Sequence, residues 1–208
     1  MTSTTFLSRR LPWATSYSLN RVDRFLIFAA ALAILATSHP CRAQATGENL
    51  LVALPTGYKV AGETKQGDKI MTLMIPEAQT IEQWTELVTT LVFLGAKDAD
   101  IAQFAANMQT QWLGTCKGGA VAPVRNGQES GMSFVIWVQV CPRDPATLSE
   151  YTYIKALAGR DSVYVVQKAA KFAPTKEYAA RWMQYLRGVS VCDTRLPNHP
   201  CPKVNPDA

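Results

Sequence analysis

The chain has 208 residues, 48% of them hydrophobic and 18% charged, which allows one folded domain preceded by a leader. Its net charge is +5, but residues 1–45 carry five arginines and one aspartate, which leaves 16 basic and 15 acidic side chains in the remainder. Nucleic-acid binding requires a clustered basic face. We therefore expect no nucleic-acid partner.

Residues 1–45 have the features of an N-terminal leader with a secretory signal peptide. Arg21 and Arg24 precede an uncharged apolar run over residues 25–36, and residues 43–45 form an Ala-Gln-Ala cleavage site. A membrane-spanning helix needs roughly 20 apolar residues, and this run is shorter. We predict a periplasmic or secreted protein with no stable membrane anchor after cleavage; the alternative is an uncleaved interfacial helix.

Four cysteines follow the leader: Cys116, Cys141, Cys192 and Cys201. An even number of cysteines in an exported chain predicts two disulfide bonds. Three pairings are open, and we favour Cys116–Cys141 and Cys192–Cys201. The first closes a long loop across two predicted strands, and the second staples a proline-containing tail.

The first half of the domain is predicted to contain three strands and then two helices. The strands cover residues 50–54, 58–64 and 69–75, and Pro- and Gly-containing turns separate them. Apolar residues then recur at helical spacing over residues 80–95 and again over residues 100–113. Thr80 and Gln83 have the spacing of a capping box at the start of the first helix.

The second half is predicted to contain four strands and a final helix. The expected elements are a strand over 120–124, a turn at Asn126-Gly127, a strand over 132–141, a hairpin of strands 151–158 and 163–169, and a helix between Thr175 and Gly188. The strand over 132–141 is apolar on both faces, so we expect it to be central in its sheet.

This order predicts an α+β fold, with a mostly antiparallel sheet covered by helices. We divide the chain into the leader (1–45), a single α+β domain (46–191) and a disulfide-stapled C-terminal tail (192–208). The element order resembles the PsbP-like fold, a sheet between helical layers, over residues 48–191.

Four segments resemble stretches of uncharacterised small exported proteins of Gram-negative bacteria. They read ENLLVALPTGYK, FVIWVQVCP, VYVVQKAAKF and WMQYLRGVSVCD. This resemblance implies a family without a known activity, so it assigns no functional residue.

No motif for a catalytic, cofactor or metal site stands out after the leader. His199 is the only histidine left and no Cys-x-x-Cys pair is present, so we expect no metal site and no cofactor. The remaining enzymatic hypothesis is a carboxylate pair, either Glu82 with Glu86 or Asp98 with Asp100. The first pair is expected on the polar face of a helix and the second at a helix start, where charged residues are common.

Four tryptophans follow the leader: Trp84, Trp112, Trp137 and Trp182. Three belong to predicted helix stripes and one to the apolar strand, so we expect them in the core. A ligand-stacking role would require exposed rings.

The function that these observations favour is a non-catalytic binding or interaction domain with a protein or small-molecule partner in the periplasm. The alternatives are an enzyme of unrecognised type that uses carboxylates and a structural envelope component. Arg195 and Leu196, at the tip of the stapled tail, are candidate interaction residues, because prolines and ring closure reduce the ordering cost of binding. The simpler interpretation of the tail is a clamp that protects the chain end.

Overall fold

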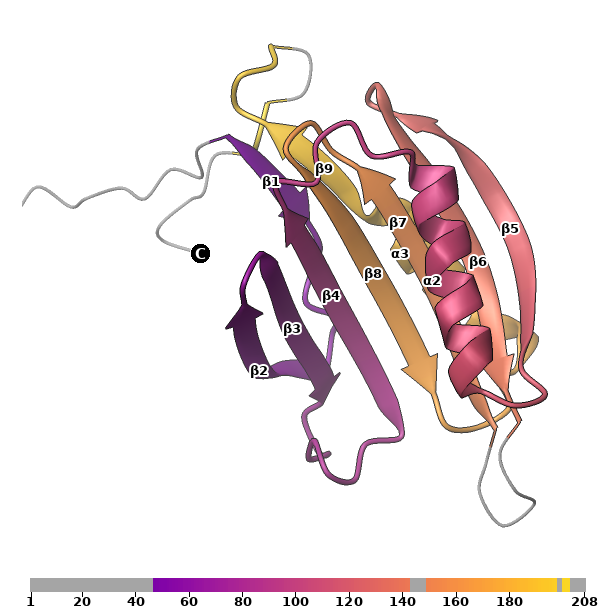
Figure 1. Ribbon diagram of the computed structural model, residues 1–208. Helices are drawn as coiled ribbons and strands as arrows, with labels where there is room; N and C mark the ends of the chain where they lie inside the picture. The colour runs from indigo at the N-terminus through magenta and orange to yellow at the C-terminus, as the bar shows by residue number, and fades with distance from the viewer. Residues whose placement is uncertain (1–46, 143–148, 198–199, 203–208) are drawn as a thin grey trace, which may run out of the picture. The chain divides into compact units, whose positions relative to one another are not determined.

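The computed structural model describes residues 47–142, 149–197 and 200–202, which are drawn in colour in Figure 1. The leader, its cleavage site and His199 lie outside the described residues. Strands make up 49% of the described residues and helices 19%, so the domain is mostly β. The expected α+β fold with helices covering the sheet is therefore wrong. No helix in the described part of the chain is long and apolar enough to cross a membrane.

Seven strands form one antiparallel sheet, and two more form a small second sheet. The large sheet has the order β2 (Tyr58–Gln66), β3 (Lys69–Pro76), β4 (Glu86–Leu94), β8 (Ser162–Ala170), β7 (Glu150–Ala158), β6 (Met132–Cys141) and β5 (Ala120–Glu129). The small sheet pairs β1 (Glu48–Leu51) with β9 (Ser190–Asp193), and the helices are α2 (Ile101–Thr115) and α3 (Lys176–Gly188). The first and last strands of the described chain thus lie side by side.

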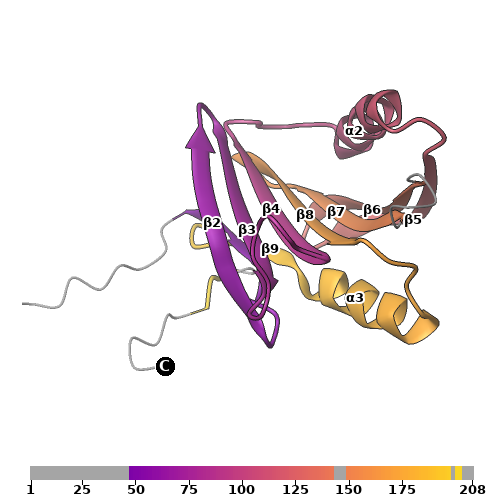
Figure 2. The same ribbon diagram turned by 90° about the horizontal axis from the view of Figure 1, so that it is seen from below.

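The two helices lie on opposite faces of the large sheet (Figure 2). Ile101 and Ala105 of α2 are buried in a cluster on one face. Trp182 and Leu186 of α3 are buried in a cluster on the other face. The sheet therefore has an apolar core on each side, and burial of these side chains is the main force that holds the helices against it.

Both helices begin close to the residues that the sequence predicts. Asp100 accepts hydrogen bonds from the backbone N–H groups of Ala102 and Gln103 at the start of α2. Thr175 accepts a hydrogen bond from the backbone N–H of Tyr178 at the start of α3. These caps satisfy helix-end N–H groups that have no partner within the helix.

The helix expected over residues 80–95 is wrong, because most of this segment is strand β4. Val88 and Val92 contact the cluster beneath α3, while Leu91 and Phe93 contact the cluster beneath α2. A strand that is covered on both faces does not alternate apolar with polar residues. The apolar residues of β4 therefore fit the spacing of a helix as well as that of a strand.

Two further expectations fail within the hairpin of β5 and β6. Asn126-Gly127 is not a turn but lies within β5, opposite Val135 and Phe134, and the turn falls at Ser130-Gly131. Both turn residues have positive φ, 54° and 71°, as this two-residue connection requires. Strand β6 is second from the edge rather than central; it is apolar on both faces because both clusters cover it.

Both predicted disulfide bonds are present, with the favoured pairing. Cys116–Cys141 joins the end of α2 to the end of β6, and Cys192–Cys201 joins β9 to the tail. The second bridge therefore begins inside the domain, because Cys192 pairs with Asn49 in the small sheet.

The core role expected for the tryptophans is confirmed for Trp137 and Trp182, which are buried. Trp84 and Trp112 are half-buried. The ring of Trp84 lies against the ammonium of Lys171, with Nζ 3.6 Å from the ring centroid.

Candidate functional site

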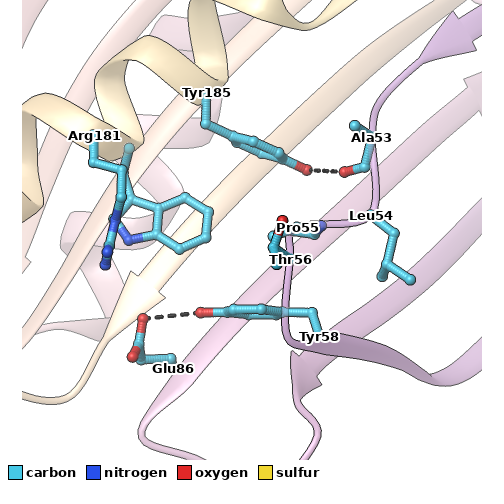
Figure 3. Close-up of a pocket in the computed structure, with 9 residues that line it drawn as sticks. Ala53, Leu54, Pro55, Thr56, Tyr58, Glu86, Arg181 and Tyr185 are labelled. Carbon is cyan, nitrogen blue, oxygen red and sulfur yellow. Dashed lines mark hydrogen bonds between the residues drawn. The ribbon is translucent and has the colours of Figure 1, made fainter.

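A cavity of about 480 Å³ opens between α3 and the loop that joins β1 to β2 (Figure 3). It is lined by Ala53, Leu54, Pro55, Thr56, Tyr58, Glu86, Arg181, Trp182 and Tyr185. Arg181 and Tyr185 extend from α3, whereas Tyr58 of β2 and Glu86 of β4 lie opposite them. Small-molecule sites typically have volumes of about 300–1,000 Å³ and mostly apolar walls, and this cavity fits that description.

Hydrogen bonds hold the loop that forms one wall of the cavity. The hydroxyl of Tyr185 donates to the carbonyl oxygen of Ala53 at 2.7 Å, which ties the loop to α3. The backbone N–H of Tyr58 donates to the carbonyl of Pro55 at 3.0 Å and closes a turn that includes Gly57. Gly57 has a φ of 77°, a conformation that glycine adopts without strain. The wall is therefore formed by the fold itself.

Three donors converge on a single carboxylate oxygen at the floor of the cavity. Glu86 Oε2 accepts hydrogen bonds from the hydroxyl of Tyr58 at 2.9 Å, the hydroxyl of Tyr178 at 2.6 Å and Nζ of Lys168 at 2.8 Å. The donors come from β2, α3 and β8, and the acceptor comes from β4. The side chain of Glu86 is 22% exposed, so the group lies between the core and the cavity.

The ammonium of Lys168 lies in a cage of aromatic rings behind this carboxylate. Nζ is 4.2 Å from the ring centroid of Trp182, 5.1 Å from that of Tyr58 and 5.8 Å from that of Tyr178. It also donates to the hydroxyl of Tyr58 at 2.8 Å. The side chain has no exposed surface, so the ring faces and Glu86 replace the water that the charge has lost.

Burial and pairing shift the protonation of these groups in opposite directions. Burial lowers the pKa of Lys168 to about 8, although the hydrogen bond and charge of Glu86 act against this shift. Burial alone would raise the pKa of Glu86, but the hydrogen bonds from Lys168, Tyr178 and Tyr58 outweigh it and lower the pKa. Burial and the hydrogen bond to Glu86 raise the pKa of both tyrosines. At neutral pH the group is therefore an ion pair with two neutral phenol donors.

This arrangement makes Glu86 a poor catalytic base. Its pKa is lowered, and Oε2 already accepts three hydrogen bonds from the fold. General acid–base catalysis works best with a group whose pKa lies near the working pH and whose proton can reach the substrate. Glu86 fits the role of a fixed counter-ion for Lys168 better than that of a proton shuttle.

The structure does not bring either expected carboxylate pair together in this cavity. Glu82 is exposed in the segment before β4, so its expected position with Glu86 on the polar face of a helix is wrong. Asp98 precedes α2 and Asp100 caps it. Among the described residues, Glu86 is the only carboxylate that lines the cavity.

Arg195 and Leu196, the candidate interaction residues, lie just after β9 and away from the lining of the cavity. Arg195 donates from Nε and Nη2 to the two carboxylate oxygens of Asp193, at 2.8 and 2.7 Å, and from Nη2 to Asp161 at 2.7 Å. These hydrogen bonds lower the pKa of Asp193 to about 2. Arg195 thus ties the tail to the turn between β7 and β8, and its role in partner binding stays a prediction.

Sequence reasoning missed the residues that form this site: Tyr58, Lys168, Tyr178, Arg181 and Tyr185. One signal was present. Lys168 follows Tyr164 and Val166 at a spacing of two on strand β8, and this spacing places its side chain on the same face as these two residues. A lysine at such a position needs a buried counter-ion, although the sequence does not identify Glu86 as that residue.

No protein-family model matches this chain, and no curated protein matches it. The arguments for function therefore rest on the site.

The buried ion pair predicts a strongly non-additive mutant cycle. Glu86→Gln leaves the ammonium of Lys168 buried without an anion, and we expect the free energy of unfolding to fall by about 3 kcal/mol. Adding Lys168→Met to this variant removes the unpaired charge and should restore most of the loss. Urea denaturation measures each value, with Glu82→Gln as a matched control that should change stability by less than about 0.5 kcal/mol. Additive losses for Glu86→Gln and Lys168→Met would contradict a direct pair.

The lowered pKa of Lys168 predicts a stability change at alkaline pH. This pKa is about 8 in the folded protein and 10.5 in an exposed lysine, so the unfolded chain binds more protons at this residue between the two values. Stability rises with pH wherever the unfolded state binds more protons. Urea titrations of the wild type and of Lys168→Met give the difference between their free energies of unfolding. We expect this difference, wild type minus variant, to rise between about pH 8 and pH 10. A flat or falling difference would show that Lys168 titrates as an exposed lysine does.

Proposed function

We propose that the mature chain is an exported, non-catalytic binding domain that holds a small molecule between α3 and the loop joining β1 to β2. The observation that carries this proposal is a preformed cavity with, among the described residues, a single lining carboxylate, whose Oε2 already accepts three hydrogen bonds from the fold. A site of this kind offers shape, apolar surface and fixed polar groups.

The walls of the cavity support binding because they are already rigid. Trp182 packs edge-to-face with Tyr185 at 5.2 Å and with Tyr58 at 5.7 Å between ring centroids. Tyr185 is also hydrogen-bonded to the loop, and Tyr58 to Glu86. A ligand that enters a preorganised site loses less affinity to the ordering of side chains.

The carboxylate-enzyme alternative gains less support from the same geometry. A carboxylate pair that acts on a substrate needs both groups to face one space. In the described residues the cavity has one carboxylate, and Lys168, the amine that pairs with it, has no exposed surface. Neither group is free to exchange a proton with a bound molecule.

Two observations support export of the chain. The leader has a charged flank, a short apolar run and a cleavage site, as a secretory signal requires. The two disulfide bonds fit an oxidising compartment, since cytosolic thiols stay reduced. We propose the bacterial periplasm as the compartment and the uncharacterised exported proteins as the family, because of the four segments that resemble them.

Export predicts a processed N terminus. Protein isolated from the envelope fraction of cells that express the full chain should begin at Thr46 or within a few residues of it, because the Ala-Gln-Ala site ends at residue 45. N-terminal sequencing measures this directly. A sequence that begins at Met1 would contradict export through a cleaved signal.

Binding in the cavity predicts that a neutral aromatic probe is taken up at one site. We expect N-phenyl-1-naphthylamine to show saturable fluorescence enhancement with the full chain produced with both disulfides formed. Thr56→Trp places a large ring on the cavity wall and should abolish this signal. Thr64→Trp is the matched control, because Thr64 is exposed on β2 and does not line the cavity. Absence of saturable binding, or equal binding by both variants, would contradict the proposed site.

A further inference from the structure

Arg181 is the charged side chain at the cavity that the fold leaves without an anionic partner. Among the described residues its guanidinium forms no hydrogen bond and no ion pair; it contacts the rings of Tyr178 and Trp182, with Cζ 5.3 and 5.7 Å from the ring centroids. Arg195, by contrast, is held by two carboxylates, and Lys155 by Glu129. Stacking fixes the direction of the Arg181 guanidinium and leaves its donors available.

The cavity therefore carries one uncompensated positive charge. The charges of Lys168 and Glu86 cancel each other within their ion pair, so Arg181 alone remains. The charge of Arg181 also acts on the floor of the site. Burial is the main cause of the lowered pKa of Lys168, and the positive charge of Arg181 lowers this pKa further. An anion that enters the cavity would relieve this repulsion as well as pair with Arg181.

A second polar group in the lining lacks a partner. Trp182 is 4% exposed, and its Nε1–H is a buried side-chain donor with no acceptor in the described part of the protein. Buried donors are satisfied in the great majority of cases, and each exception calls for an explanation. This donor is closed to solvent, so a ligand in the cavity would pair with Arg181 and not with Trp182.

Apart from Glu86 and Thr56, the remaining lining residues are apolar or aromatic. The rings of Tyr58 and Tyr185 contact Trp182 edge-on, and Leu54 lies beside them at the rim with half of its surface exposed. Such walls favour a planar apolar body over a sugar or a peptide, which carry polar groups at every position. A single free cation also favours a singly charged ligand over a phosphate with two charges.

From these contacts we infer that the ligand is a flat, apolar molecule that carries one carboxylate. The carboxylate pairs with the guanidinium of Arg181, and the apolar body lies against the rings of Tyr58 and Tyr185. Arginine suits this role because its planar donors match the two oxygens of a carboxylate. This inference rests on the proposed function, since it specifies what the cavity binds.

Two probes of nearly equal shape test the charge of the ligand. Isothermal titration calorimetry compares naphthalene-1-carboxylate with naphthalene-1-carboxamide on the full chain with its disulfides formed. We expect the carboxylate to bind about tenfold more tightly, the gain of one charge-assisted hydrogen-bonded pair. Raising the salt concentration should weaken only the carboxylate, because Arg181 is exposed.

Arg181→Gln should remove the preference for the carboxylate, and an unchanged circular dichroism spectrum and thermal midpoint should show that the variant is folded. Arg187→Gln is the matched control, because Arg187 is exposed on the same helix and does not line the cavity; it should keep the full preference. Equal binding of both probes by the wild type would overturn the inferred ligand class but leave the binding domain intact. A preference that survives Arg181→Gln would overturn the role of Arg181. Binding of neither probe at millimolar concentration would overturn the ligand class and, with a negative result for the neutral fluorescent probe, the proposed function too.

Discussion

An ammonium group enclosed beneath α3 constrains much of this fold. Removing a charge from water costs several kcal/mol even in a relaxed protein interior, so Lys168 must be compensated wherever the chain places it. The compensation comes from four elements: β8 carries the lysine, β4 its counter-ion, β2 one phenol, and α3 a second phenol and an indole. A shift of β4 would leave the charge without its counter-ion, and a shift of β2 or α3 would remove its aromatic contacts. Glu86, Tyr58 and Trp182 of this group also line the cavity, so this part of its surface is held by contacts of the core.

A second buried ammonium holds the other end of the helix. Lys155 on β7 donates to Glu129 Oε2 of β5 at 2.6 Å and to the carbonyl oxygen of Val189 at 2.7 Å. Val189 follows the last residue of α3, whereas Tyr178, the partner of Glu86, lies near its start. Directional contacts therefore fix α3 near both ends, and apolar packing alone would not define its position along the sheet so narrowly.

Local signals were sufficient for much of the fold. The hairpin of β7 and β8 and the helices α2 and α3 follow from turn residues, caps and spacing within short stretches of sequence, whereas the disulfide pairing was one of three that the sequence left open. The helix predicted over residues 80–95 was wrong because burial on both faces of a strand removes the alternation of apolar and polar residues that distinguishes a strand from a helix. The site was not predicted for a different reason. Lys168 and Glu86 are 82 residues apart in the sequence, and Lys168 and Tyr58 are 110 apart, so only the order of strands in the sheet brings them together. Spacing within the sequence carries no information about such pairs.

The pairing of β1 with β9 affects the stage of synthesis and folding at which the native structure can be completed. Glu48 lies opposite Asp193, so the first strand of the described chain has no partner until the chain has been made as far as β9. Contacts between distant parts of a chain form slowly, because a long loop must close before they contribute. The loop that forms one wall of the cavity directly follows β1. A nascent chain can therefore assemble the large sheet before this wall is in place, and the cavity should be among the last features that the folding chain completes.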